Sequence, residues 1–140
     1  MENDPPLIGR SLSEQMRRGD VMAAACPSRE VLKHVTSRWG VLVLIGLEGG
    51  TRRFGELRRL IGGVSERMLA QTLQWLESDG LVDRVARKVV PPHVEYSLTP
   101  LGREAAAKVG DLADWIETSL PSILAQRENA ASRAFPRAGE

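Results

Sequence analysis

The sequence is poor in the residue types that form disulfides, metal centres and catalytic pairs. Cys26 is the single cysteine, so no disulfide can form within one chain. The two histidines, His34 and His93, do not stand at metal-ligand spacing. Catalysis needs a converging nucleophile and base, or a set of metal ligands. We therefore predict that the protein is not an enzyme and holds no metal.

Long hydrophobic runs are also missing. The longest, residues 39–47, is about half the length that a membrane-spanning helix needs. The N-terminus carries Glu2 and Asp4 and lacks a basic start followed by an apolar stretch, so we expect no signal peptide. With 140 residues, of which 42% are hydrophobic and 26% charged, the composition is that of one ordinary globular domain. We expect a cytoplasmic protein without a membrane segment.

The formal net charge of +1 is uninformative, but its distribution is less so. Residues 51–98 carry eight basic and six acidic side chains, whereas residues 1–50 balance and residues 99–140 carry one more acid than base. Arg84, Arg87 and Lys88 cluster with no acid between them. This is a weak indication of nucleic-acid binding, and a solvated surface is the alternative interpretation.

Residues 54–80 carry the pattern around which the chain is arranged. Leu57, Leu60 and Ile61 give a first helix one apolar side, and glycines at 62–63 end it. Ser65 is placed to cap a second helix over 65–79, which Gly80 ends. The apolar stripe of that second helix is Leu69, Leu73 and Leu76, and its outer face is Glu66, Arg67, Ala70, Gln71 and Gln74. Two short helices with such a turn and an arginine-bearing outer face indicate a helix-turn-helix.

Two further helices are predicted before this pattern. Residues 28–37 follow Pro27, which suits a first helical position, and their inward stripe is Val31, Leu32 and Val35. Residues 40–48 are apolar almost all round, which is typical of a buried helix. Upstream, a short helix over 12–19 is expected behind a capping box of Ser11 and Glu14, and residues 1–10 are expected to be a disordered tail.

After Gly80 the apolar period changes from helical to alternating. Strands are predicted over 81–86 and 94–98, joined by the basic, proline-containing segment 87–93, and together they form a wing. Thr99 and Pro100 then start a long helix. Its apolar stripe is Ala105, Val109, Leu112, Ile116 and Leu120. Pro121 is expected to kink or restart this helix, and residues 128–140 are expected to form a flexible tail.

The predicted fold is mainly α with a small β-hairpin: a winged helix-turn-helix domain over 11–127, with N- and C-terminal dimerisation helices. At this point the sequence resembles the HxlR-type winged helix-turn-helix transcriptional regulators of bacteria. The resemblance covers roughly residues 26–118 and is carried by Cys26-Pro27, Arg38-Trp39, RFGELRR at 53–59, GVSERML at 63–69, LESDGLV at 76–82 and PHVEYSLTPLG at 92–102. It implies a homodimeric DNA-binding regulator that uses no cofactor.

Base reading is expected from the outer face of the second helix. Arg67 and Gln71 lie one turn apart, and in the major groove arginine can make two hydrogen bonds to guanine and glutamine two to adenine. Each good pair contributes about 1–3 kcal/mol of discrimination between bases. Ser65 is foremost a cap, and the helix start that it caps could also hold a phosphate. The alternative for this face is simple solvation.

Contacts to the DNA backbone are expected from side chains around this helix. Arg53 precedes the helix-turn-helix, and Arg87 and Lys88 lie on the wing, where phosphate or minor-groove contact is expected. Thr72 could reach the backbone, but it borders the apolar stripe and could equally belong to the core. His93 is assigned a structural role.

Cys26 is the candidate regulatory residue. A thiol at a helix N-terminus is close to unpaired amides and the positive end of the helix dipole, which favour the thiolate. Some members of the resembling family sense oxidants or electrophiles through such a cysteine, so a small thiol-reactive effector is one hypothesis. The alternative is an inert helix-entry residue, which the alanines at 23–25 favour. Oxidation could link two subunits, or stop at a sulfenic acid or an adduct.

The helix after the wing is expected to form a twofold dimer, because a complete winged domain leaves it little core to cover. The predicted interface residues are Leu112, Trp115, Ile116 and Leu120. Folding of this stripe back onto its own domain is the alternative. A dimer would place two recognition helices about 34–36 Å apart and would therefore bind a palindromic operator in double-stranded DNA.

A sequence-specific regulator, a repressor rather than an activator, is thus the first interpretation. A winged-helix protein-interaction module that binds no DNA is the second. Such a module would carry an apolar or acidic recognition face, and the face with Arg67 and Gln71 is neither.

Overall fold

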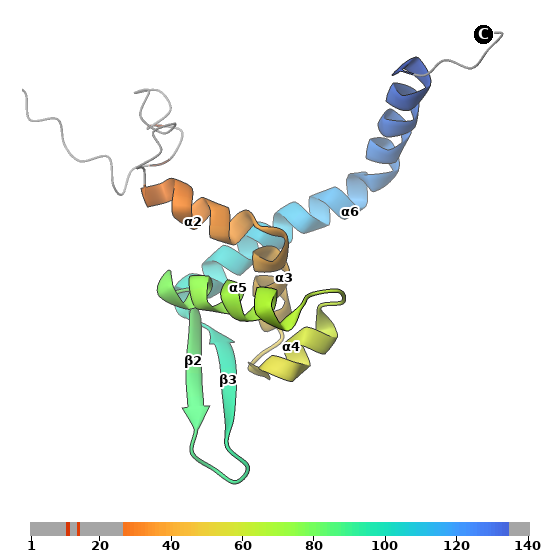
Figure 1. Cartoon of the computed structure of the whole chain (residues 1–140). Coiled ribbons are helices and arrows are strands. Elements are labelled where there is room, and N and C mark those ends of the chain that lie inside the picture. Colours follow the sequence, from red (N-terminus) through yellow and green to blue (C-terminus); the bar gives the residue numbers. More distant parts are fainter. Residues whose placement is uncertain (1–10, 12–13, 15–26, 135–140) are drawn as a thin grey trace, which may run out of the picture.

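The structure, a computed structural model, describes Ser11, Glu14 and residues 27–134. In chain order the elements are α2 (Pro27–Thr36), α3 (Arg38–Leu47), β1 (Arg52–Arg53), α4 (Phe54–Leu60), α5 (Glu66–Ser78), β2 (Val82–Arg87), β3 (His93–Leu98) and α6 (Pro100–Ala134) (Figure 1). The predicted tail at 1–10 and most of the predicted helix at 12–19 lie outside the described residues. Within that stretch the Glu14 amide donates to Ser11 Oγ at 3.2 Å, as expected of a helix cap.

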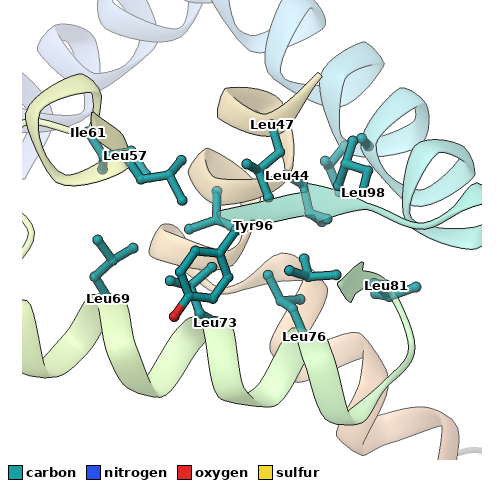
Figure 2. Packing of buried hydrophobic residues seen from close by; sticks show 14 of the residues in the cluster. Leu44, Leu47, Leu57, Ile61, Leu69, Leu73, Leu76, Leu81, Tyr96 and Leu98 are labelled. Atoms are coloured by element: carbon teal, nitrogen blue, oxygen red, sulfur yellow. The ribbon is translucent and has the colours of Figure 1, made fainter. Parts of the chain in front are cut away.

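Helix α3 is the centre of the domain, as its apolar composition predicts. Its Val43 and Leu44 are completely buried, and α4, α5, β3 and α6 all pack against it. Figure 2 shows the leucines of α3, α4 and α5 converging with Tyr96 and Leu98 of β3. The predicted stripe of α5, residues 69, 73 and 76, is confirmed as core.

The junction between α2 and α3 depends on a glycine. Ser37 caps α3 by accepting from the Gly40 amide at 3.1 Å, and the Ser37 hydroxyl donates to the His34 carbonyl at 2.9 Å. A Cβ at position 40 would collide with that same carbonyl oxygen. Glycine therefore allows the last turn of α2 to lie against the first turn of α3.

Three residues predicted to face inward are exposed. Val31 and Leu32 of α2 lie at the surface, because α2 turns His34 and Val35 toward the domain instead. Leu60 of α4 is also exposed, whereas Leu57 and Ile61 are buried. The helix α4 is only seven residues long and contributes the buried Leu57 and the partly buried Phe54 to the core, while Ile61 follows directly after its last residue.

The sheet has three strands rather than the predicted two, in the order β1-β3-β2, and all pairs are antiparallel. The two-residue β1 shows no alternation that sequence could reveal. Its Arg52 pairs with Tyr96, and on the other side of β3 the same Tyr96 pairs with Arg84 of β2. The wing consists of β2, the loop 88–92 and β3, and Figure 1 shows it projecting away from the helices.

Helix α6 begins as predicted and ends later. Thr99 Oγ1 accepts from the Gly102 amide at 2.9 Å and donates to the Gly80 carbonyl at 2.6 Å, which fixes the helix start to the end of α5. The helix continues through Pro121 to Ala134, so residues 128–134, predicted as flexible tail, are helical. Figure 1 shows α6 leaving the domain and bending in its second half, and the internal proline accounts for such a bend.

Only the first turns of α6 join the core, through Gly102, Ala106 and Val109. Further along, α6 runs beyond the domain. No helix among the described residues has the length and apolarity that a bilayer crossing needs.

Candidate nucleic-acid interface

The helix-turn-helix is held in shape by local polar contacts. Ser65 Oγ accepts from the Met68 amide at 3.1 Å, which confirms the predicted cap of α5. Gly63 supplies the turn with a φ of 87°, a conformation that side chains disfavour. Arg58 of α4 forms an ion pair with Glu66 of α5 at 3.1 Å across the turn. These contacts set the direction in which α5 leaves the turn.

The outer face of α5 is open to a partner. Arg67 and Gln74 are exposed, and Gln71 between them is half-buried. Within the described part of the chain, no carboxylate lies within ion-pair distance of Arg67. The two residues predicted to read bases therefore project from one side of a capped helix, opposite its buried stripe.

Thr72 is a correction to the predicted contact set. Its side chain is only 2% exposed, and its hydroxyl donates to the Met68 carbonyl at 2.7 Å. The hydroxyl is already used inside the helix and faces the core, so it has no route to the DNA backbone. Of the two interpretations given for this residue, the core position is the one that the fold adopts.

Arg53 lies at the start of α4 with its side chain exposed. Its backbone amide donates to Glu56 Oε1 at 2.9 Å, which fixes the first turn of α4. The guanidinium of the neighbouring Arg52 is occupied instead, because its Nε donates to the Gly46 carbonyl at 2.8 Å. Of this arginine pair, Arg53 thus keeps the accessible charge.

Next to its loop, the wing is held together by one carboxylate with two partners. Glu95 accepts from Arg87 Nε and from His93 Nε2, each at 3.0 Å. The hydrogen bonds from His93 and then Arg87 hold the pKa of Glu95 below its ordinary value. Arg87 thus has a structural partner, whereas Lys88 at the start of the loop is exposed and has no acidic partner among residues 27–134. The structural role assigned to His93 agrees with this pair.

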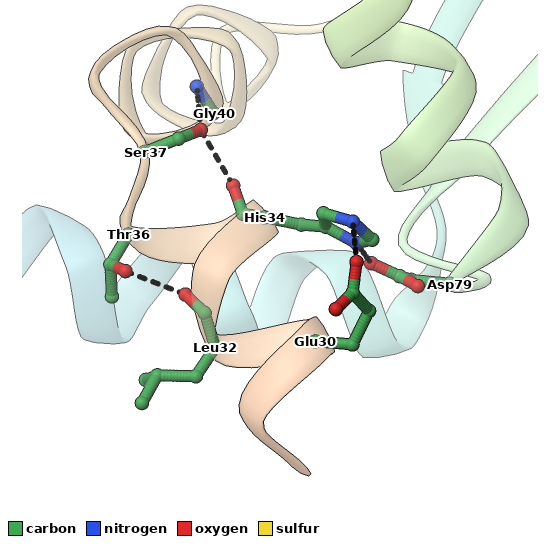
Figure 3. A network of polar contacts seen from close by, with 7 residues as sticks. All are labelled: Glu30, Leu32, His34, Thr36, Ser37, Gly40 and Asp79. Carbon is green, nitrogen blue, oxygen red and sulfur yellow. Dashed lines mark hydrogen bonds and ion pairs between the residues drawn. The ribbon is translucent and has the colours of Figure 1, made fainter. Parts of the chain in front are cut away.

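Sequence reasoning missed a polar junction between α2 and the far end of α5. His34 Nδ1 and Asp79 Oδ2 are 2.7 Å apart (Figure 3). The imidazole also stacks on Trp75, with ring centres 5.1 Å apart and planes 8° from parallel. The outer nitrogen, Nε2, lies 3.5 Å from Glu30. Residues 45 positions apart give no periodic signal. The junction fixes the C-terminal end of the recognition helix to α2.

The remaining predicted site residues are Cys26, before α2, and the four interface residues on α6. Cys26 is outside the described residues, and α2 begins at the next position, Pro27. Of the predicted interface residues on α6, Leu112, Trp115 and Ile116 are exposed, with Trp115 at 60%, and Leu120 is half-buried. The single chain therefore leaves most of that stripe uncovered.

A capped recognition helix behind a tight turn, followed by a two-stranded wing, defines the winged helix-turn-helix class. Comparison with known proteins gives the family. The HxlR-like helix-turn-helix family matches residues 34–123, more than half of the chain. The protein therefore belongs to the HxlR-type family of helix-turn-helix transcriptional regulators, as the sequence motifs indicate.

Three relatives illustrate the likeness. YtfH of Escherichia coli strain K12, described as an uncharacterized HTH-type transcriptional regulator, is 64% identical over 122 residues, which cover 87% of this chain and 97% of YtfH. The solved structure of the transcriptional regulator ytfH from Salmonella typhimurium is 69% identical, covers 76% of this chain and 95% of its own, and has a TM-score of 0.72. The redox regulator HypR in its oxidized form is 36% identical over 66% of this chain and 96% of its own, with a TM-score of 0.61.

Proposed function

We propose that the protein is a homodimeric, sequence-specific repressor of transcription. In this proposal α5 enters the major groove of operator DNA, and the wing at 87–93 lies on the neighbouring backbone or minor groove. The observation that carries it is the outer face of α5: a capped helix in a helix-turn-helix presents an exposed Arg67, which has no carboxylate partner among the described residues, beside Gln71. In the major groove, arginine forms paired hydrogen bonds with guanine, and glutamine forms paired hydrogen bonds with adenine.

The uncovered stripe of α6 supports the dimer. Leu112, Trp115 and Ile116 recur at helical spacing and are exposed together. Contiguous apolar patches of this kind mark interaction sites, and a second copy of the same helix offers a matching face. In such a dimer the two recognition helices would meet successive turns of DNA, about 34–36 Å apart, on a palindromic operator. A dimer bound across a promoter would block transcription, and chromosomal DNA as partner places the protein in the cytoplasm.

The test is a gel shift with DNA from upstream of the protein's own gene, beside a scrambled duplex of equal length and composition. The proposal predicts retention of the upstream DNA at concentrations where the scrambled duplex stays free, and a footprint with twofold symmetry. Equal binding to both duplexes would contradict sequence-specific recognition. A footprint of a single half-site would contradict the dimer.

We further propose that the regulator responds to oxidants or electrophiles through Cys26. Support comes from the position of Cys26 directly before α2 and from the likeness to HypR, which is described as a redox regulator. The gel shift is repeated after mild oxidant or quinone treatment, with Cys26→Ser in parallel. Loss of binding in the wild type and its retention in Cys26→Ser is the expected result. Unchanged binding by the treated wild type would assign Cys26 a structural role.

A further inference from the structure

A cleft separates the recognition helix from the wing. It encloses about 340 Å³ between the wing side of α5 and the start of the hairpin. Its lining residues are Ala70, Leu73, Gln74 and Glu77 of α5, Arg84 of β2 and Tyr96 of β3. The cleft borders the outer face of α5, because Gln74 belongs to both.

Arg84 and Tyr96 meet at this cleft from neighbouring strands. They are direct partners in the antiparallel β2–β3 ladder, so their side chains lie on the same face of the sheet. Arg84 is exposed, and within the described chain no carboxylate lies within ion-pair distance of its guanidinium. It is the one cation among the residues that line the cleft.

Tyr96 contributes an unused hydroxyl. Its side chain is only 8% exposed, yet the hydroxyl has no hydrogen-bond partner within the described part of the protein. No buried polar side-chain atom of the described residues lacks a partner, so the hydroxyl itself must be in contact with solvent. Tyr96 lines the cleft, which gives its hydroxyl that contact. Figure 2 shows the ring projecting from β3 toward α5, beside Leu69 and Leu73. Since no described protein group uses this hydroxyl, it is available to donate to a ligand group that enters the cleft.

The geometry of DNA identifies that group. If α5 lies in the major groove and the wing in the adjacent minor groove, the sugar-phosphate strand that divides the two grooves must cross the cleft between them. A guanidinium is suited to phosphate, and tyrosine hydroxyls are common donors to phosphate oxygens. We propose that Arg84 and Tyr96 together bind a backbone phosphate of the operator strand that passes between helix and wing. This inference rests on the proposed DNA-binding function.

Glu77 provides a way to distinguish a phosphate site from a structural role of Arg84. Its carboxylate also lines the cleft and would repel a phosphate. A structural alternative is that Arg84 balances the charge of Glu77 without contacting DNA. The two interpretations predict opposite results for Glu77→Gln: a phosphate site gains affinity when the repelling charge is removed, whereas a charge-balancing role leaves DNA affinity unchanged or weakens it.

The experiment measures DNA affinity by fluorescence anisotropy between about 50 and 200 mM salt, the range over which phosphate contacts strongly affect binding. The wild type is compared with Arg84→Ala, Tyr96→Phe and Glu77→Gln on the upstream duplex and on a scrambled one. Arg103→Ala is the control, because Arg103 is an exposed arginine of α6 outside this cleft. Tyr96→Phe keeps the ring in the core, and thermal unfolding verifies that each variant is folded.

Arg84→Ala is expected to weaken binding to both duplexes by about tenfold. It should also make the plot of log affinity against log salt shallower by about 0.9 for each phosphate that the variant no longer binds. Tyr96→Phe is expected to weaken both by about threefold without changing the slope, since the hydroxyl is neutral. Glu77→Gln should strengthen both, and Arg103→Ala should match the wild type.

Four results would overturn the proposal. Glu77→Gln that binds the two duplexes no more tightly than the wild type would assign Arg84 the charge-balancing role. If Arg84→Ala has the same affinity and the same salt slope as Arg103→Ala, Arg84 does not contact a phosphate. If Arg84→Ala binds only the upstream duplex more weakly, Arg84 contacts a base and not a phosphate. An unchanged affinity of Tyr96→Phe removes the hydroxyl from the site. Failure of the proposed DNA-binding function gives a different result from failure of the phosphate site, because in that case the wild type itself binds neither duplex.

Discussion

The junction of His34 with Asp79 supports a quantitative prediction about stability. Asp79→Ala removes the acceptor that lies 2.7 Å from His34 Nδ1. The His34 side chain is 8% exposed, so the nitrogen would lose its partner without gaining water. An unsatisfied buried group of this kind costs about 1–3 kcal/mol. For a domain of this size, that corresponds to a fall in Tm of roughly 4–12 °C.

Urea denaturation measures this cost, and Glu30→Gln is the matched control. Glu30 lies 3.5 Å from the other ring nitrogen but its side chain is 68% exposed, so its removal should cost less than about 0.5 kcal/mol. His34→Phe keeps a ring against Trp75 while removing the hydrogen bond, and in combination with Asp79→Ala it should show a coupling of at least about 0.5 kcal/mol. Equal, small costs for Asp79→Ala and Glu30→Gln, or additive double variants, would refute the junction as a stabilising contact.

Three further predictions concern the cap of α5, the wing and the exposed stripe of α6. Ser65→Ala should lower the free energy of unfolding by about 0.5–2 kcal/mol in urea denaturation, since the Met68 amide loses its acceptor, and an unchanged midpoint would contradict the cap. Because the pKa of Glu95 is lowered in the folded protein, its pairs with Arg87 and His93 stabilise the wing fully at pH values above the ordinary carboxyl pKa of 4.5. This stability is lost as the pH falls through the lower folded-state pKa. The protection factors of the amides at 88–90, which correct for the fall of the intrinsic exchange rate with pH, should therefore decrease on acidification in the wild type and not in Glu95→Gln; equal pH profiles would exclude this role. Trp115→Asp should shift the protein to monomer in analytical ultracentrifugation, and a persistent dimer would place the interface elsewhere.

Apart from β1, the order of elements was accessible from sequence because the helices and the two strands of the wing carry local signals. The stripe of α5, the cap at Ser65 and the alternation that ends at Leu98 are short-range patterns, and each is confirmed. Thr99 and Pro100 likewise announce the start of α6 locally.

Features that depend on tertiary contacts were not accessible. The pairing of His34 with Asp79 joins residues 45 positions apart, and β1 is too short to alternate. Which of two neighbouring apolar residues faces inward also depends on the partner element: Ile61 meets the core, while Leu60 beside it does not. Thr72 shows the same limit at the site, because a residue at the edge of a stripe can be core or surface until the packing decides.

The wing illustrates how function is distributed over the fold. Arg84, Arg87 and Lys88 form one basic cluster in the sequence, yet the structure gives them three environments. Arg87 pairs with Glu95, Lys88 is exposed at the loop, and Arg84 lines the cleft beside α5. A run of like charges therefore does not act as one surface, and each member needs its own test.

The most direct test of the central claim, that α5 reads operator bases, is the affinity of Arg67→Ala for upstream and scrambled DNA. Removal of a base contact costs about 1–3 kcal/mol per site, so the upstream duplex should be bound about tenfold or more weakly, with little change on the scrambled duplex. An equal fall on both duplexes would make Arg67 a phosphate contact, and no fall on either would contradict the assignment of α5 as the reading helix.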